Sequence, residues 1–185
     1  TNASSYVSNA GSLGEVRIDN TSAVDAVDLL LTNSGSIATS LDEALIVNAS
    51  GGGAVRLEVR NSGSLAAASS DTVNITGLQS GSFTLVNTGS LSATSSTNNA
   101  INASGVQASI FITNGGNARI ENNNNLALNF ENMVGNFSLI SAGRIQSNQT
   151  TINLNGASAV TASAFEICNG YERDANGNCS EVSSG

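Results

Sequence analysis

Acid–base chemistry in this chain would depend on carboxylates, because the 185-residue sequence contains no histidine and no lysine. Glycoside hydrolysis, for example, requires a pair of carboxyl groups that converge on one sugar. Asp42 and Glu43 are adjacent in a predicted loop, Asp25 and Asp28 lie at the approach to a predicted strand, and the other acids are scattered. Adjacent loop acids usually form a solvated pair, so we predict that the chain is not an enzyme and binds no metal or other cofactor.

A polysaccharide lyase would instead need a basic residue beside a calcium site. Arg56 and Arg60 flank Leu57 and Val59 at outward positions, with Glu58 between them. This alternation is typical of a charged face of a strand. The alternative function is therefore binding or cleavage of carbohydrate. Cleavage would depend on Asp42 or Glu43.

The two cysteines lie near the end of the sequence, at Cys168 and Cys179. Between them, Asp174 to Gly177 read Asp-Ala-Asn-Gly, a sequence that favours a hairpin turn. A structural disulfide formed in an oxidising compartment is therefore favoured. A metal site with Asp174, Asn176 and Asn178 is the competing interpretation, although a calcium loop needs glycine at its sixth position, where Cys179 stands. A catalytic thiolate is disfavoured because the chain has no histidine to activate it.

One short sequence motif, called here the repeated phrase, recurs along the chain, and the fold is predicted from it. It begins with Asn-x-Gly in most copies, and successive copies start 24, 28, 26, 27 and 27 residues apart. A repeat period of this length indicates stacked supersecondary units. The copies are Asn9–Leu13, Asn33–Ile37, Asn61–Leu65, Asn87–Leu91, Asn114–Ala118 and Ser141–Ile145.

Apolar residues alternate with polar ones on both sides of each phrase, which is the signature of strands with one buried face. Three such strands occur per repeat, the third marked in the fifth repeat by Leu126 and Leu128. We therefore predict an all-β, three-sided parallel β-solenoid of about six coils of 24–28 residues. Its predicted interior contains Leu31, Ile37, Val59, Leu65, Leu85, Leu91, Ile112, Leu139 and Ile145.

The Asn-x-Gly step is expected to form the first corner of each coil. Asparagine and glycine enter left-handed backbone conformations at the least cost, and stacked asparagine amides can form a hydrogen-bonded ladder. The predicted ladder consists of Asn9, Asn33, Asn61, Asn87 and Asn114, with Gly11, Gly35, Gly63, Gly89, Gly116 and Gly143 beside it. Ser141 interrupts the asparagine column in the last repeat, as terminal repeats often do.

Charge and composition limit the partners of this chain. Its formal net charge is −8, which disfavours nucleic acid and anionic membrane surfaces. No segment is apolar enough to span a bilayer, so we predict no membrane insertion and place the protein outside the cell or on its surface. The complete lack of proline suits a fold in which nearly every backbone N–H joins a ladder.

The repeated Asn-x-Gly phrases, each after an alternating strand, resemble the passenger domains of bacterial autotransporters and related β-helical surface adhesins. That resemblance covers about Val7 to Val160 and implies a right-handed β-helix that acts in cell-surface adhesion or as a self-stacking fibre subunit. The predicted solenoid domain comprises residues 1–167. Its expected partners are further copies of the chain, joined end to end, and glycans or other cell surfaces. Residues 168–185 would form a disulfide-closed hairpin and tail, since Cys168 to Tyr171 and the turn before Cys179 resemble the last hairpin of an EGF-like module.

Overall fold

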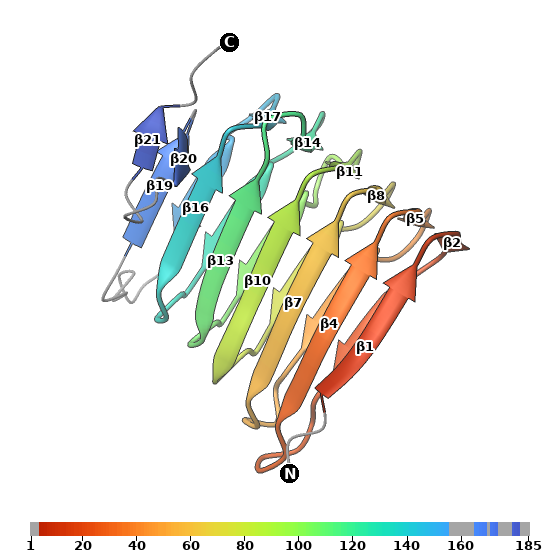
Figure 1. Ribbon diagram of the computed structural model, residues 1–185, viewed down its shortest axis with the longest axis vertical. Helices are drawn as coiled ribbons and strands as arrows, with labels where there is room; N and C mark the ends of the chain where they lie inside the picture. The colour runs from red at the N-terminus through yellow and green to blue at the C-terminus, as the bar shows by residue number, and fades with distance from the viewer. Residues whose placement is uncertain (1–3, 156–164, 170, 174–178, 182–185) are drawn as a thin grey trace.

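The computed structural model describes residues 4–155, 165–169, 171–173 and 179–181. These residues form strands, turns and loops, and no helix is found among them, so none of the described chain has a helix that could cross a membrane. Three parallel sheets run side by side along one axis (Figure 1). This arrangement confirms the predicted all-β parallel solenoid of about six coils.

Each coil contributes one strand to each of the three sheets, which we name sheets A, B and C. Sheet A contains β1 (Ser4–Asn9), β4 (Val27–Asn33), β7 (Val55–Asn61), β10 (Gly81–Asn87), β13 (Ser109–Asn114), β16 (Phe137–Ser141) and β19 (Phe165–Asn169). Sheet B contains β2 (Ser12–Leu13), β5 (Ser36–Thr39), β8 (Ser64–Ala67), β11 (Ser90–Ala93), β14 (Arg119–Asn122) and β17 (Arg144–Ser147). Sheet C contains β3 (Val16–Asp19), β6 (Leu45–Asn48), β9 (Val73–Thr76), β12 (Ile101–Ser104), β15 (Leu128–Glu131) and β18 (Ile152–Asn155).

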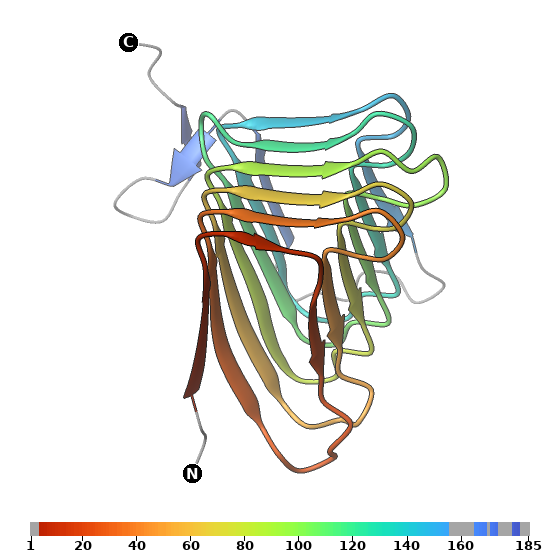
Figure 2. The ribbon, with the colours of Figure 1, turned by 90° about the vertical axis from the view of Figure 1, so that its right-hand side faces the viewer.

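The three sheets enclose the interior of the solenoid (Figure 2). A continuous cluster of buried side chains fills this interior. Alternate residues of each strand point inward, and parallel pairing in register stacks equivalent residues directly above one another. The predicted interior is correct, with Ile145 only partly buried and the others almost inaccessible. Phe130 and Phe137 pack edge to face with ring centroids 4.6 Å apart.

The predicted register of the third strand in the fifth repeat was wrong by two residues. Leu128 and Phe130 are the inward pair of β15, stacked on Ile101 and Ala103, whereas Leu126 lies in the preceding loop and is partly exposed. The cause is an enlarged first corner between Asn114 and β14, which shifts the rest of the coil along the sequence. The inward residue of β14 is accordingly Ile120, which pairs with Leu91 and Ile145.

Among the described strands, sheet A continues one strand beyond sheets B and C. Its last strand, β19, pairs with β16 and includes Cys168, so the domain boundary predicted after residue 167 falls inside this strand. Two further strands, β20 (Tyr171–Arg173) and β21 (Cys179–Glu181), form an antiparallel hairpin. The hairpin lies beside the outer surface of sheet A near β16 (Figure 2).

Candidate functional site

The corner between sheets A and B contains a continuous asparagine ladder inside the solenoid. Asn33 Nδ2 donates hydrogen bonds to Asn61 Oδ1 at 2.8 Å and to the backbone oxygen of Ser64 at 3.0 Å. Each rung therefore bonds both to the next asparagine and to the backbone of the next coil. The same 2.8 Å amide bond joins Asn9 to Asn33, Asn61 to Asn87 and Asn87 to Asn114.

The two ends of this ladder differ chemically. At the first coil, Asn9 Oδ1 has no preceding asparagine in the described chain and accepts the backbone N–H of Gly11 at 3.1 Å. At the last coil, Asn114 Nδ2 donates to Ser141 Oγ at 3.2 Å, and Ser141 Oγ donates to the backbone oxygen of Gly143 at 3.0 Å. Ser141 thus continues the chain of hydrogen bonds and directs it back to the backbone.

Most glycines beside the ladder are required because the backbone of the preceding coil lies too close to leave room for a side chain. A Cβ atom on Gly35, Gly63, Gly89 or Gly143 would lie 2.0–2.1 Å from a backbone oxygen of the preceding coil. The prediction that the Asn-x-Gly corners adopt left-handed backbone conformations is wrong. Positive φ angles in the described residues occur at Asn132, Gly52, Gly77, Gly81 and Gly105, none of them in the repeated phrase. Close approach of successive backbones, and not backbone handedness, excludes a side chain here.

Gly116 does not belong to this glycine column, which corrects the prediction for the fifth repeat. A Cβ atom on Gly116 would meet no atom within 4 Å. Gly116 lies in a turn closed by a hydrogen bond from Ala118 N–H to Gly115 O at 2.9 Å, and the Ala118 oxygen then accepts the N–H of Arg144. Ala118 therefore replaces the glycine as the backbone acceptor, because the turn inserts two residues into this corner.

A second asparagine ladder lies on the outward face of sheet C and was not predicted. Asn102 Nδ2 donates to Asn74 Oδ1 at 3.2 Å, and the series continues from Asn129 to Asn102 and from Asn153 to Asn129. Asn74 Nδ2 in turn donates to Glu43 Oε1 at 3.0 Å. The donors of this ladder point toward the first coil, opposite to those of the inner ladder.

Asp71 lies buried in the corner between sheets B and C, one loop away from Glu43. Burial raises the pKa of Asp71 to about 6, and the Glu43 carboxylate acts in the same direction, although the N–H of Asn99 donates to Asp71 and opposes the shift. Asp71 is the most strongly perturbed acid of the described chain. No signal in the local sequence distinguishes it from the exposed acids.

The first coil forms an edge at which β1, β2 and β3 each have a single neighbour among the described strands. Val7 and Leu13 occupy inward positions there, yet they are 37% and 39% exposed. Their counterparts in the second coil, Leu31 and Ile37, are completely buried. In later coils, the equivalent core residues and strand edges are covered by neighbouring coils on both sides. In the first described coil, one side of these groups has no neighbour among the described strands.

The backbone groups available at this edge follow from parallel pairing, in which successive residues point alternately to the two sides of a strand. In β4, Val27 N–H points forward to Ala54 O at 2.8 Å, whereas Ser34 N–H, just beyond this strand, points back to Asn9 O at the same distance. By this alternation, the N–H groups of Tyr6 and Ser8 in β1 point away from β4, toward the edge.

The described residues do not bring Asp42 and Glu43 together as a pair of catalytic carboxylates. Asp42 is exposed, and Glu43 is engaged by Asn74. No group of three or more His, Cys, Asp or Glu residues in the described ranges could hold a metal ion. Cys168 is buried in β19 and disulfide-bonded. The side chain of its predicted partner, Cys179, and the proposed metal ligands Asp174, Asn176 and Asn178 lie outside the described part of the molecule.

Comparison with known proteins does not assign a family. The chain matches no family model, no curated protein and no solved structure.

Proposed function

We propose that this protein is an extracellular structural rod that associates with further copies of itself through the edge of its first coil. The observation that carries the proposal is the exposure of Val7 and Leu13 at core positions of that coil. Apolar side chains beside strand edges that have no neighbour among the described strands favour addition of another strand. A second copy is a suitable source of that strand, because its own coils already have the required spacing.

The internal architecture supports a mechanical role. The inner asparagine ladder and the tightly packed glycine column hold each coil against the next, so the column resists bending and sliding. The disulfide at Cys168 supports residence in an oxidising compartment such as the cell exterior. The resemblance to β-helical surface adhesins points to the same location.

The direction of the backbone groups defines a sharp test of association. Proline at Ser8 removes an N–H that points to the edge, and an edge strand tolerates proline on that side. Alanine at Ser8 keeps the N–H and is the matched control. Size-exclusion chromatography with light scattering, together with electron microscopy, should show oligomers or fibres for the wild type and for Ser8→Ala, and monomers for Ser8→Pro.

The fold must be intact in both variants for this comparison to count, which circular dichroism and thermal unfolding establish. A wild-type protein that stays monomeric at high concentration would refute self-association. Equal assembly of Ser8→Pro and Ser8→Ala would show that association, if present, uses another surface.

A further inference from the structure

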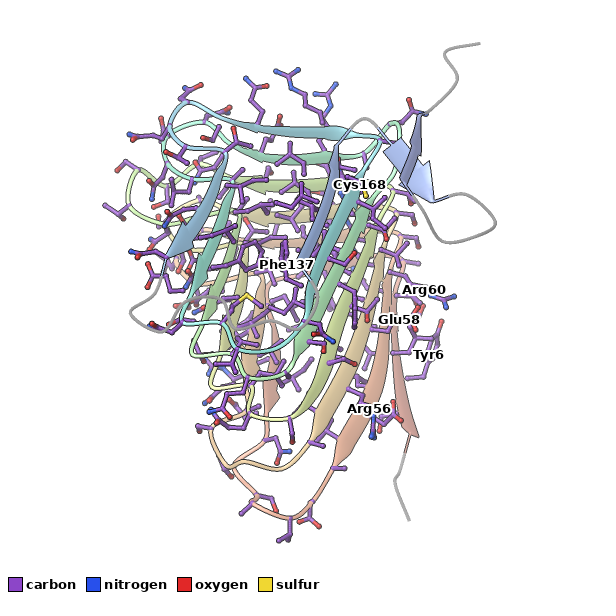
Figure 3. All side chains as sticks on the ribbon, turned by 90° about the vertical axis from the view of Figure 1, so that its left-hand side faces the viewer. Tyr6, Arg56, Glu58, Arg60, Phe137 and Cys168 are labelled. Atoms are coloured by element: carbon purple, nitrogen blue, oxygen red, sulfur yellow. The ribbon has the colours of Figure 1, made fainter. Side chains whose placement is uncertain are left out.

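The outward face of sheet A carries an ordered row of side chains along the solenoid axis. Parallel pairing aligns Tyr6, Leu30, Glu58, Thr84 and Phe111, one from each of five successive strands. Figure 3 shows Tyr6, Glu58 and the flanking arginines of β7 on this outer surface, away from the enclosed core. Over these five strands the row has an aromatic ring at each end and polar groups near its centre, and the register continues it from Phe111 to Ser138 of β16.

Both aromatic residues of this row are accessible. Tyr6 is 63% exposed and Phe111 is 40% exposed, although aromatic residues are scarce in this chain. They are separated by four strand spacings, which corresponds to about 19 Å along the axis. The phenol of Tyr6 is held by a 3.0 Å hydrogen bond with Thr32 Oγ1, which limits the freedom of the ring.

A hollow of about 340 Å³ lies in the outer surface of sheet A, lined by residues of β1, β4, β7 and β10. Asp28, Arg56, Glu58, Ser82 and Thr84 contribute to its lining. Asp28 and Arg56 are register partners on adjacent strands, yet no ion pair within 4.0 Å joins them in the described structure. The hollow is therefore flanked by a carboxylate and a guanidinium that are both available to a ligand.

The remaining charged groups of the face are already satisfied. Arg60 Nε donates to Glu58 Oε1 at 2.6 Å, and Glu58 of this pair contributes to the lining of the hollow. Two acids and two arginines make the face electrically balanced, in contrast to the net charge of −8 for the whole chain. A strongly charged ligand would gain little from such a surface and would, if anionic, be repelled by the molecule.

We propose that this face of sheet A, from Tyr6 to Phe111, binds a neutral polysaccharide in an extended conformation. The exposed rings offer apolar surfaces for the C–H faces of pyranose units, while Asp28 and Arg56 accept from and donate to hydroxyl groups in the hollow. An extended β-linked glycan advances per sugar by a step comparable to the strand spacing, so about four or five sugars cover the row.

This inference adds a ligand class to the proposed structural role and depends on a different surface. The association edge is formed by the backbone of the first coil, whereas the hollow is lined mainly by residues of β4, β7 and β10, with Ser5 as its contact in β1. Glycan binding and self-association can therefore fail independently. The Ser8→Pro variant should lose association and still bind glycan, because its Tyr6 side chain and hollow are retained.

Calorimetric titration with cellopentaose, mannopentaose and chitopentaose tests the proposal directly. We expect saturable binding of at least one of these probes at millimolar or lower concentration. Phe111→Ala and Arg56→Ala should each weaken that binding about tenfold or more, because each removes a main contact. The matched controls are Leu41→Ala, an exposed apolar residue in another corner, and Arg144→Ala, an exposed arginine on sheet B.

Three results would overturn the proposal. The first is the absence of saturable binding for all three neutral probes. The second is equal affinity of Phe111→Ala, Arg56→Ala and the two control variants. The third is tighter binding of an acidic probe, pentagalacturonic acid, than of every neutral one. Unchanged circular dichroism and unfolding temperature in the variants ensure that a loss of affinity reports on the surface.

Discussion

Asn61 Nδ2 donates a 2.8 Å hydrogen bond to Asn87 Oδ1, and these two almost completely buried side chains are 26 residues apart in sequence. The same Nδ2 group donates to the backbone oxygen of Ser90 at 3.1 Å, while Asn33 donates to Asn61 Oδ1. Every polar atom of the Asn61 amide is thus occupied by a neighbouring coil. The ladder couples adjacent coils and fixes their register.

Replacement of Asn61 by alanine should destabilise the protein by about 2–4 kcal/mol, because the amide of Asn33 and the oxygen of Ser90 lose their partner inside the molecule. Asn117→Ala is the matched control, since Asn117 is exposed in the inserted turn, and should change stability by less than about 0.5 kcal/mol. Denaturant unfolding monitored by circular dichroism measures both. Equal stabilities of the two variants would contradict the role assigned to the ladder.

Gly63→Ala should be far more damaging than Gly116→Ala, although both glycines stand in the repeated phrase. A Cβ atom on Gly63 would lie 2.0 Å from Gly35 O, whereas one on Gly116 would meet nothing within 4 Å. We expect a loss of about 3 kcal/mol or more for Gly63→Ala and little change for Gly116→Ala. Thermal unfolding of the two variants distinguishes close backbone approach from a general preference for glycine at these corners.

Asp71 should make the protein more stable in mild acid than at neutral pH. Its pKa in the folded state, about 6, is above the ordinary value of 3.8, so the folded protein binds the proton more tightly than the unfolded chain. The stabilising contribution is complete below pH 3.8 and is lost as the pH rises through 6. Across the whole titration, a pKa difference of about 2 units corresponds to about 3 kcal/mol.

Asp71→Asn should flatten this part of the pH profile, because the amide keeps an acceptor for Asn99 N–H and does not ionise. Unfolding free energies of wild type and variant, measured in urea across the interval, give the difference directly. Asp42→Asn removes one negative charge from an exposed loop and controls for the change in net charge. A wild-type profile parallel to that of Asp71→Asn would contradict the assignment.

Cys168 and Cys179 should be recovered as one linked peptide after digestion without reductant. Their joint replacement by serine removes a closed loop and should loosen the last strand of sheet A and the hairpin, at a cost of about 3 kcal/mol in the chain-entropy account. Hydrogen exchange should rise in residues 165–181 and stay unchanged in the central coils, because solenoid coils contact mainly their neighbours. Two native thiols that react freely with an alkylating reagent would refute the linkage.

Leu31, Leu65 and Leu91 were predictable as core residues because strand alternation and the repeat period act together on them. The position of Ile120 as the inward residue of β14 was not predictable in the same way. The inserted turn after Asn114 keeps the Asn-x-Gly sequence but changes the register of the residues that follow. Similarly, the sequence identifies the glycines of the corners, but the clash with the preceding coil exists only once the coils are stacked.

The outer ladder of Asn74, Asn102, Asn129 and Asn153 has a signal in the sequence. Its members are separated by 28, 27 and 24 residues, which are spacings close to those of the inner ladder. The high pKa of Asp71 and the hollow beside Arg56 had no such signal, because both depend on which loops and strands become neighbours in space.

Hydrogen exchange at the backbone amides of Tyr6 and Ser8 tests the central proposal most directly, since these groups point to the edge of the first coil. Protection should increase with protein concentration in the wild type, because strand addition by another copy engages these N–H groups. In Ser8→Pro, the amide of Tyr6 should exchange rapidly at every concentration. Rapid exchange of both wild-type amides under conditions where light scattering detects oligomers would show that the copies associate through a different surface.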